Sequence, residues 1–317
     1  MKTNYLFTVF TPVFNRVKTI DRVYESLCNQ TIKDFEWIII DDGSTDDLYR
    51  KKIRKYIEDE KIAIKYFYQE NSGKHVAFFE AIKIASSTFF LTLDSDDEYL
   101  PNTLEIFKAA WSEIPDNLKS NFCSVTGLCV NQYGETVGTR FPEDIFDSNS
   151  IESHYKYRIK GEKCGFSLTK ILKNFSFPND DSTNRQYVGE GVFWNELSKE
   201  YKTRYINKIV RIYYIEEKDS LMTFNLSDKN AEGNIFYYSY KLNNDINYFR
   251  YAPLYFLYYG VMLAKFSSMK NKKFLDTYKN LAPVISKIIF VIAFPISFLL
   301  FRMNFISIIK QLNGFFK

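Results

Sequence analysis

The densest chemistry in this sequence is the run Leu91-Thr-Leu-Asp94-Ser-Asp96-Asp97, in which an apolar, β-prone segment ends in three carboxylates. Carboxylates this close repel one another, and the repulsion raises the pKa of at least one of them unless a cation lies between them. A divalent cation relieves that repulsion, and Mg²⁺ or Mn²⁺ bound by carboxylates usually carries phosphate oxygens on its open faces. The alternative is a solvated acidic loop that caps the next helix.

A second acidic strand end lies upstream. The run Glu36-Trp-Ile-Ile-Ile40 stops at Asp41-Asp42-Gly43-Ser44-Thr45-Asp46, which predicts a buried strand that enters a tight turn and a helix cap. A first strand over residues 5–10 ends at Thr11-Pro12-Val13-Phe14-Asn15-Arg16. In open α/β sheets ligands bind at the carboxyl ends of the strands, so we expect a nucleotide and its metal where these loops converge.

These blocks resemble the family 2 glycosyltransferases, which have the GT-A fold. The resemblance rests on the order and spacing of Thr11–Arg16, Ile38–Asp46, Glu70–His75 and Asp94–Asp97. A fifth block, Gly189-Glu190-Gly-Val-Phe-Trp194-Asn195, is similar to the acidic segment that carries the catalytic base in bacterial capsular, exopolysaccharide and lipopolysaccharide assembly members.

The resemblance implies an inverting transfer of a sugar from a nucleotide-diphosphate sugar to a saccharide or lipid-linked saccharide acceptor. It implies a UDP-sugar, because the carboxylate of Asp41 can accept a hydrogen bond from the N3–H of a uracil-type base. For Asp41 and Asp42 turn and cap chemistry is the alternative, and Lys74 is nearly as well explained as a surface lysine. The expected donor-binding residues are Thr11, Pro12, Val13, Phe14, Arg16, Asp41, Asp42, Gly43, Ser44, Asn71, Lys74, Asp94 and Ser95.

We expect Asp96 to bind the metal, Mn²⁺ or Mg²⁺, with Asp94 on the ribose, on a metal-bound water or on the metal itself. A metal there would neutralise the charge that builds on the departing diphosphate. Asp97 is expected to orient the acceptor or to cap the following turn.

Glu190 is the expected general base, because a single carboxylate opposite the leaving group gives in-line displacement and inversion. Trp194, one helical turn later, is expected to contact the acceptor sugar. Helix capping is the alternative role for Glu190, and Asp180 and Asp181 are competing bases.

Charge is distributed unevenly along the 317 residues. From Lys265 onward nine basic residues and one acidic residue give +8, which leaves −4 for the remainder of a chain with a net charge of +4. A basic, apolar tail on an acidic enzyme predicts contact with an anionic membrane surface and not with nucleic acid. Aromatic residues are 18% of the chain, which suits sugar stacking or a membrane-facing surface as well as core packing.

Cysteine usage indicates a reducing compartment. Cys28, Cys123, Cys129 and Cys164 form no C-x-x-C pair and no zinc spacing. The apolar stretch over residues 5–10 is too short for a signal peptide. We therefore expect a cytoplasmic enzyme, peripheral on the inner face of the cell membrane.

Strand and helix patterns alternate over residues 1–110, which predicts an α/β fold with a mostly parallel sheet flanked by helices. Pro101 is expected to open a helix, and a hairpin is expected around Tyr133-Gly134. Residues 142–187 are polar and irregular and are expected to form acceptor-side loops and short helices. A helix over 190–200 and two short strands over 203–214 complete the catalytic region.

This pattern divides the chain into a catalytic domain, residues 1–220, and a C-terminal helical extension, residues 221–317. Within the catalytic domain, residues 1–110 would bind the nucleotide sugar and residues 111–220 the acceptor. In the extension, Ile288–Phe301 is uncharged but holds Pro295 and is shorter than the ~20 residues of a spanning helix. We expect a helix that lies in the membrane plane or re-enters it within residues 281–310; a buried helix of a soluble dimer is the alternative.

Two other functions fit parts of the pattern: a non-catalytic carbohydrate-binding or scaffold protein on the same fold, and a sugar-phosphate nucleotidyltransferase. The second usually has a glycine-rich first loop, and Thr11–Arg16 contains no glycine. The Q-x-x-R-W motif of processive synthases is absent from the sequence, which favours the addition of single sugars.

Overall fold

The computed structural model describes residues 4–175, 190–215 and 231–302. The chain forms two compact units. The first comprises residues 1–150, 161–176 and 197–216, and the second comprises residues 151–160, 177–196 and 217–317.

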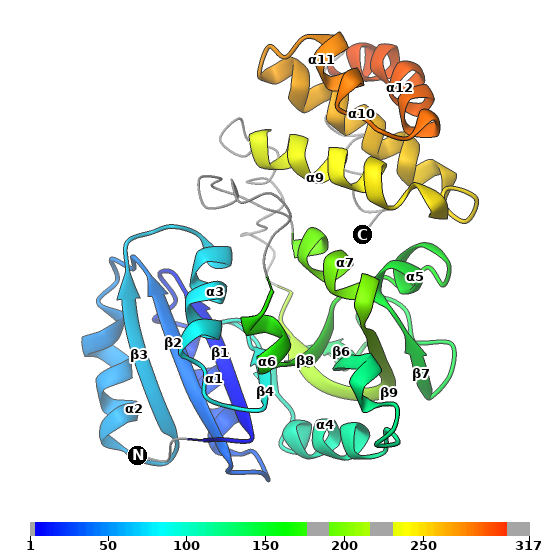
Figure 1. Ribbon diagram of the computed structural model, residues 1–317. Coiled ribbons are helices and arrows are strands. Elements are labelled where there is room, and N and C mark those ends of the chain that lie inside the picture. Colours follow the sequence, from blue (N-terminus) through cyan, green and yellow to red (C-terminus); the bar gives the residue numbers. More distant parts are fainter. Residues whose placement is uncertain (1–3, 176–189, 216–230, 303–317) are drawn as a thin grey trace. The chain divides into compact units, whose positions relative to one another are not determined.

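The first unit is built on a sheet whose N-terminal part is parallel, as predicted. Four strands lie side by side in the order β3-β2-β1-β4, with β1 at Phe7–Val13, β2 at Phe35–Asp42, β3 at Ala63–Gln69 and β4 at Phe89–Thr92 (Figure 1). The chain moves outward from β1 to β3 and then returns to the other side of β1. The carboxyl ends of β1 and β4 therefore flank the topological switch point, where doubly wound sheets bind ligands.

Alternating residues of β1 face different helices. Phe7 and Val9 join the core that contains Val23 of α1, while Phe10 packs edge-on against Phe78 of α3. The helices thus cover both faces of the sheet, as the α/β prediction requires. The helical segments of this part of the chain are α1 (Ile20–Cys28), η1 (Tyr49–Ile53), α2 (Arg54–Glu58), α3 (Lys74–Ile84) and α4 (Thr103–Ser112).

Beyond β4 the sheet becomes mixed. β8 (Lys163–Leu168) runs antiparallel to both β4 and β6 (Phe122–Asn131), and β9 (Lys202–Tyr213) runs parallel to β6. Two short strands, β5 (Glu98–Tyr99) and β7 (Ile145–Ser148), pair antiparallel with β9 and complete nine strands.

Two expectations for this region are wrong. Residues 142–187 contain a strand in the middle of the sheet, β8, in addition to β7, α5 (Ser150–Tyr155) and α6 (Thr169–Lys173). β9 is one strand of 12 residues and not two short ones. The predicted hairpin is present in a short form: Val130 and Thr136 make an antiparallel bridge, and the backbone N–H groups of Asn131 and Val137 donate to the carbonyls of Glu135 and Cys129.

The helix after the acidic loop also begins later than expected. Pro101 precedes it, and α4 starts at Thr103 after Asn102. The carbonyl of Pro101 instead accepts a hydrogen bond from the backbone N–H of Thr31, at 2.9 Å. A short 3₁₀ turn over Lys119–Asn121 connects α4 to β6.

The second unit is helical. It contains α9 (Ala231–Asn244), α10 (Pro253–Met269), α11 (Phe274–Lys279) and α12 (Val284–Arg302), with a 3₁₀ turn over Ile246–Tyr248. The last helix is longer than the uncharged stretch identified in the sequence, because it begins at Val284 and includes Lys287. Within residues 4–175, 190–215 and 231–302, no helix combines the length and apolar composition needed to cross a bilayer.

The buried carboxylate of Asp245 connects several segments of the second unit. Asp245 Oδ2 accepts hydrogen bonds from Tyr155 Oη at 2.8 Å and Asn195 Nδ2 at 2.6 Å, and it lies 3.1 Å from Lys241 Nζ. A buried charge requires such partners. This network joins residues 151–160 and the first part of α7 (Glu190–Glu200) to α9, so both segments belong to the helical unit. The domain division expected from the sequence, at residue 220, places both segments in the catalytic domain.

Candidate active site

Hydrogen bonds connect the loop after β1 to the loop after β2. The backbone N–H of Asn15 donates to Ser44 Oγ at 2.9 Å, and Asn15 Oδ1 accepts from the N–H of Thr45 at 2.8 Å. The N–H of Val17 donates to Asp46 Oδ2 at 2.9 Å. Asn15 has a positive φ of 54°, a conformation that asparagine tolerates better than most residues. The first two sequence blocks therefore form one rigid edge.

Asp41 and Asp42 accept hydrogen bonds of the kind expected for turn residues, which is the alternative role considered for them from the sequence. Asp41 accepts from the N–H of Ser44 at 2.8 Å and from Tyr66 Oη at 2.7 Å. Asp42 accepts from the N–H groups of Ser72 and Gly73, both at 2.8 Å. Asp41 thus connects the turn after β2 to β3 itself, and Asp42 connects the end of β2 to the loop after β3.

Gly43 makes that junction possible. Its φ is +85°, and a Cβ atom at this position would lie 2.9 Å from the backbone nitrogen of Asn71. Only glycine allows both the left-handed backbone and the close approach. The side chain of Asn71 in turn donates to the carbonyl of Asp42 at 2.9 Å.

The expected donor segment Thr11–Arg16 begins inside β1, which continues to Val13 instead of ending at residue 10, and it has buried and exposed members. Thr11 and Val13 are buried, and the hydroxyl of Thr11 accepts from Trp37 Nε1 at 2.9 Å, so these side chains serve the core. Phe14 is exposed, and Arg16 is half-buried with its Nε 3.9 Å from Asp96 Oδ2. In this segment Phe14 and Asn15 are exposed and Pro12 and Arg16 are partly exposed, and the donor-binding role expected for it stays a prediction.

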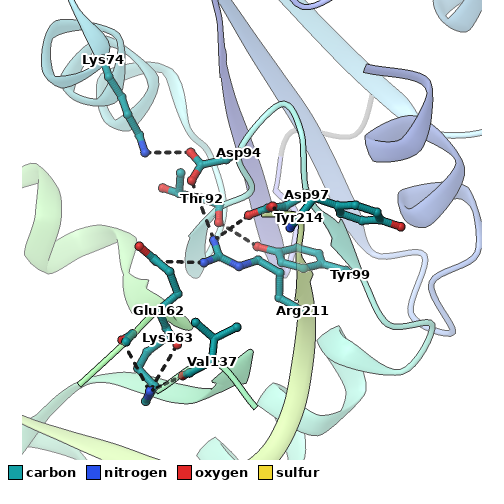
Figure 2. Close-up of polar contacts among 11 residues, drawn as sticks. Lys74, Thr92, Asp94, Asp97, Tyr99, Val137, Glu162, Lys163, Arg211 and Tyr214 are labelled. Atoms are coloured by element: carbon teal, nitrogen blue, oxygen red, sulfur yellow. Dashed lines mark hydrogen bonds and ion pairs between the residues drawn. The ribbon is translucent and has the colours of Figure 1, made fainter. Parts of the chain in front are cut away.

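The acidic loop after β4 is surrounded by basic side chains. Lys74 Nζ lies 2.7 Å from Asp94 Oδ1, and Arg211 Nη1 lies 3.9 Å from Asp94 Oδ2 and 3.5 Å from Asp97 Oδ2 (Figure 2). Burial raises the pKa of Asp94, but the charges of Lys74 and Arg211 outweigh it and hold that pKa below its usual range. Asp94 is therefore an anion at neutral pH.

Asp97 is an inward-facing carboxyl. It is almost fully buried, and its Oδ1 accepts from the backbone N–H of Tyr214 at 3.1 Å. Burial and the nearby Asp94 together outweigh the attraction of Arg211 and raise the pKa of Asp97 to about 7. This backbone partner lies just after β9 and not in the turn that follows Asp97, so the acceptor and capping roles expected for Asp97 stay predictions.

Arg211 and Glu162 are site residues that were not expected from the sequence. Arg211, in β9, is buried, and its Nη2 lies 3.1 Å from Glu162 Oε2 (Figure 2). One signal was available: Arg211 interrupts the apolar run Ile209-Val-Arg-Ile, and a buried arginine must be paired. No comparable signal marks Glu162, which is exposed.

The residues that precede Glu162 are held by a close backbone contact. Gly161 has a φ of +78°, and a Cβ atom there would lie 2.5 Å from the Cα of Gly138. Lys163 Nζ adds a hydrogen bond to the carbonyl of Val137 at 3.2 Å (Figure 2). The loop that bears Glu162 is therefore fixed against the turn after β6.

The loops after β1 to β4 fall within residues 8–141, and these residues match the sequence model of the family described as "Glycosyl transferase family 2". Residues 8–141 belong to glycosyl transferase family 2. The nine-stranded sheet with its flanking helices has the GT-A fold that this family was expected to bring.

Relatives of this family 2 domain extend the comparison. A Campylobacter jejuni "GalNAc(5)-diNAcBac-PP-undecaprenol beta-1,3-glucosyltransferase" is 29% identical over 220 residues, which cover 68% of this chain and 66% of that protein. The chain spans just under two thirds of that relative and 14% of an uncharacterized glycosyltransferase from Rickettsia bellii.

Solved structures share the fold at low identity. S. aureus TarS has a TM-score of 0.62 and 18% identity, over 89% of this chain and 50% of that chain. The mannosyltransferase PcManGT from Pyrobaculum calidifontis, solved with GDP-Man and Mn²⁺, has a TM-score of 0.54 and 14% identity, over 93% of this chain and 81% of that chain.

The family 2 domain supplies carboxylates that suit a cation shared with a ligand. Within the described residues, no three His, Cys, Asp or Glu side chains gather to hold a metal ion. Asp94 and Asp96 are both partly exposed, with 30% and 34% of their side chains accessible. Mg²⁺ and Mn²⁺ sites often use one or two carboxylates and take the remaining ligands from substrate phosphates. This donor set fits such a cation.

The expected base and acceptor residue lie in the first part of α7, which belongs to the second unit, whereas α7 from Leu197 onward belongs to the first unit. Glu190 is the first residue of this helix, and its side chain lies outside the described part of the chain, as do Asp180 and Asp181. Trp194 is partly exposed, and its ring packs edge-on against Phe193 with centroids 4.8 Å apart. The roles of Glu190 and Trp194 therefore stay predictions.

Proposed function

We propose that this protein transfers a sugar, with inversion, from a nucleotide-diphosphate sugar to a saccharide or lipid-linked saccharide acceptor in the assembly of a cell-surface polysaccharide. The observation that carries the proposal is the edge of the family 2 domain at the switch point. At this edge the hydrogen-bonded loops after β1 and β2 lie beside Asp94 and Asp96, and basic side chains face these two carboxylates.

The donor would be held by the loops after β1 to β4. Arg16 and Lys74 carry positive charge where a diphosphate requires it, and the exposed ring of Phe14 offers a stacking surface. We assign the contact with the nucleobase of the donor to Asp41, and we propose that this nucleobase is uracil. TarS was also solved with UDP-GlcNAc and PcManGT with GDP-Man, so similar folds accept either base.

Asp96, with Asp94, would hold Mn²⁺ or Mg²⁺ together with the donor phosphates. When bound, such an ion supplies Lewis-acid neutralisation of the charge on the leaving diphosphate. The protein's own contribution is electrostatic: Arg211 and Lys74 keep Asp94 ionised, and Arg16 faces Asp96.

Glu190 is our proposed general base. It would remove the proton from the acceptor hydroxyl while the hydroxyl oxygen attacks the anomeric carbon and the bond from that carbon to the diphosphate oxygen breaks. Attack on the face opposite the leaving group inverts the anomeric configuration. Trp194, on the same helix, would stack against the acceptor sugar.

We also propose that the enzyme acts on the cytoplasmic face of the cell membrane and contacts anionic lipid through its C-terminal region. The proposal rests on the net charge of +8 from Lys265 onward and on the polyprenol-linked saccharide that appears in the name of the Campylobacter relative.

The Glu190→Gln variant tests the proposed reaction. We expect transfer to fall by at least about 100-fold, the usual contribution of a general base, while nucleotide affinity stays unchanged. Glu200→Gln, at the exposed end of the same helix, is the matched control and should retain full turnover. Retained turnover in Glu190→Gln would exclude Glu190 and move the role to Asp180 or Asp181.

A further inference from the structure

Helix α12 is apolar on both of its faces. Its inner face is buried and includes Ser286, Ile289, Phe290, Ala293 and Ser297. On the opposite side, side chains that recur three and four residues apart are exposed. This outer face consists of Val284, Ile285, Ile288, Val291, Ile292, Pro295, Phe298 and Leu299.

The outer face is not an ordinary solvent-exposed helix surface. Each of its non-proline side chains is 48% to 71% exposed, and every exposed position between residues 284 and 299 is apolar. Scattered exposed apolar residues need no explanation, but a continuous stripe marks a surface that is covered in use. A helix that is apolar all round is normally surrounded by protein or lipid.

The helix cannot hide this face by rotating, because its inner face is tightly fixed. Gly260 of α10 allows the close approach, since a Cβ atom there would lie 2.9 Å from the Cβ of Ala293. Ser286 Oγ donates to the carbonyl of Leu242 at 2.5 Å, and Phe290 stacks on Phe274 with centroids 5.3 Å apart. The outer face therefore needs an external partner.

Charge identifies the chemistry of that partner. From Lys265 onward the chain has nine basic residues and only Asp276 as an acidic one. Lys287 lies at the border of the outer face and is only partly buried. A second copy of the chain would bring the same positive charge to the contact, whereas an anionic lipid surface is attracted by it.

The geometry of α12 suits a position in the plane of the membrane. Its inner face packs against protein, so lipid cannot surround it. Pro295 lies on the outer face and has no N–H group, which leaves the carbonyl of Val291 without its helical donor. Water and lipid headgroups can satisfy that carbonyl at the interface, but the hydrocarbon core cannot.

We propose that the outer face of α12 is a membrane-docking surface that lies in the headgroup region of an anionic bilayer. The inference rests on the proposed membrane location and names the surface that achieves it. A free interfacial helix turns a polar face away from the membrane. In α12 the face opposite the membrane packs on the rest of the helical unit instead.

The test measures binding of the full chain to vesicles of phosphatidylglycerol and phosphatidylcholine. The wild-type protein should float with these vesicles and bind phosphatidylcholine alone several-fold more weakly. The double variant Ile288→Glu, Val291→Glu should bind at least about tenfold more weakly, because it places two charges in the apolar contact. Ile145→Glu is the matched control: it changes an exposed isoleucine of the first unit and should bind like wild type.

Three results would overturn the inference. The first is wild-type protein that does not bind the vesicles, and the second is a double variant that binds as well as wild type. The third is a lipid-free dimer in sedimentation velocity that the double variant dissociates, because the outer face would then be covered by a second copy. Thermal unfolding checks that the variants fold. Nucleotide titrations on the same samples separate this inference from the proposed function, since donor binding does not require the outer face.

Discussion

At the scale of residues, the acidic edge of the sheet is organised by a buried arginine. Arg211 faces Asp94, Asp97 and Glu162, which come from two segments far apart in the sequence. A buried guanidinium is costly unless its partners are well placed, and removing one member of such a group leaves uncompensated charge behind. Arg211 therefore positions the carboxylates of the site as well as balancing their charge.

Arg211→Gln should consequently destabilise the first unit. We expect the free energy of unfolding to fall by about 3–5 kcal/mol, because Asp94 loses a counter-charge and the buried Asp97 is left without one. Urea denaturation followed by tryptophan fluorescence measures the change. Arg54→Gln is the control, since it removes an exposed partner of Glu58 and should leave the urea midpoint unchanged. Equal midpoints for the two variants would show that Arg211 has no such role.

The sequence predicts residues of this kind only in part. Asp94 and Asp96 are recognisable because they follow an apolar strand and because their block resembles a family motif. The loops after β1 and β2 are predicted to converge, and hydrogen bonds from Asn15 join them. Glu162 could not be found, because it reaches Arg211 through the pairing of β8 with β6 and of β6 with β9, which no local pattern encodes.

At the scale of elements, local patterns predict the parallel half of the sheet well. β1, β2 and β4 are apolar runs, and the alternation of strands with helices predicts that β1 to β4 are parallel. β8 is not recognisable in the same way, because its six residues include Lys163 and Gly165 and make a weak strand signal. Its place between β4 and β6 comes from tertiary pairing, which overrides propensity.

The loop before β8 provides a test at this scale. Gly161→Ala forces a side chain into a left-handed backbone and against the Cα of Gly138, 2.5 Å away. Gly134→Ala is the matched control, because Gly134 has a similar φ of +84° but nothing lies within 4 Å of an added Cβ. Both variants bear the backbone strain, so Gly161→Ala should be less stable by a further ~1–3 kcal/mol from crowding. Urea denaturation compares the two, and equal losses would mean that the Gly138 contact does not constrain the loop.

At the scale of the whole molecule, a family 2 domain with an acidic edge is combined with a basic helical unit. The sequence indicated both, through its motif blocks and its uneven charge. It did not indicate that residues 151–160 and the start of α7 belong to the helical unit, because Asp245 recruits Tyr155 and Asn195 from distant segments. Glu190 and Trp194 thus fall in the helical unit, although α7 continues into the first unit from Leu197.

The central claim, a sugar-nucleotide site at the carboxyl edge of the sheet, is tested most directly by calorimetric titration of UDP, GDP and CMP into the full chain, with Mn²⁺ and with a chelator. UDP should bind at least about tenfold more tightly with Mn²⁺, and Asp96→Asn should lose that gain, since one charge-assisted interaction is worth ~1.5–3 kcal/mol. Asp116→Asn, which changes an exposed carboxylate, is the control and should keep the gain in UDP affinity with Mn²⁺.

Binding of GDP alone would keep the enzyme class but contradict the assignment of a uracil contact to Asp41. Absence of binding by every nucleotide, with and without Mn²⁺, would contradict the claim itself and favour a non-catalytic carbohydrate-binding protein on this fold.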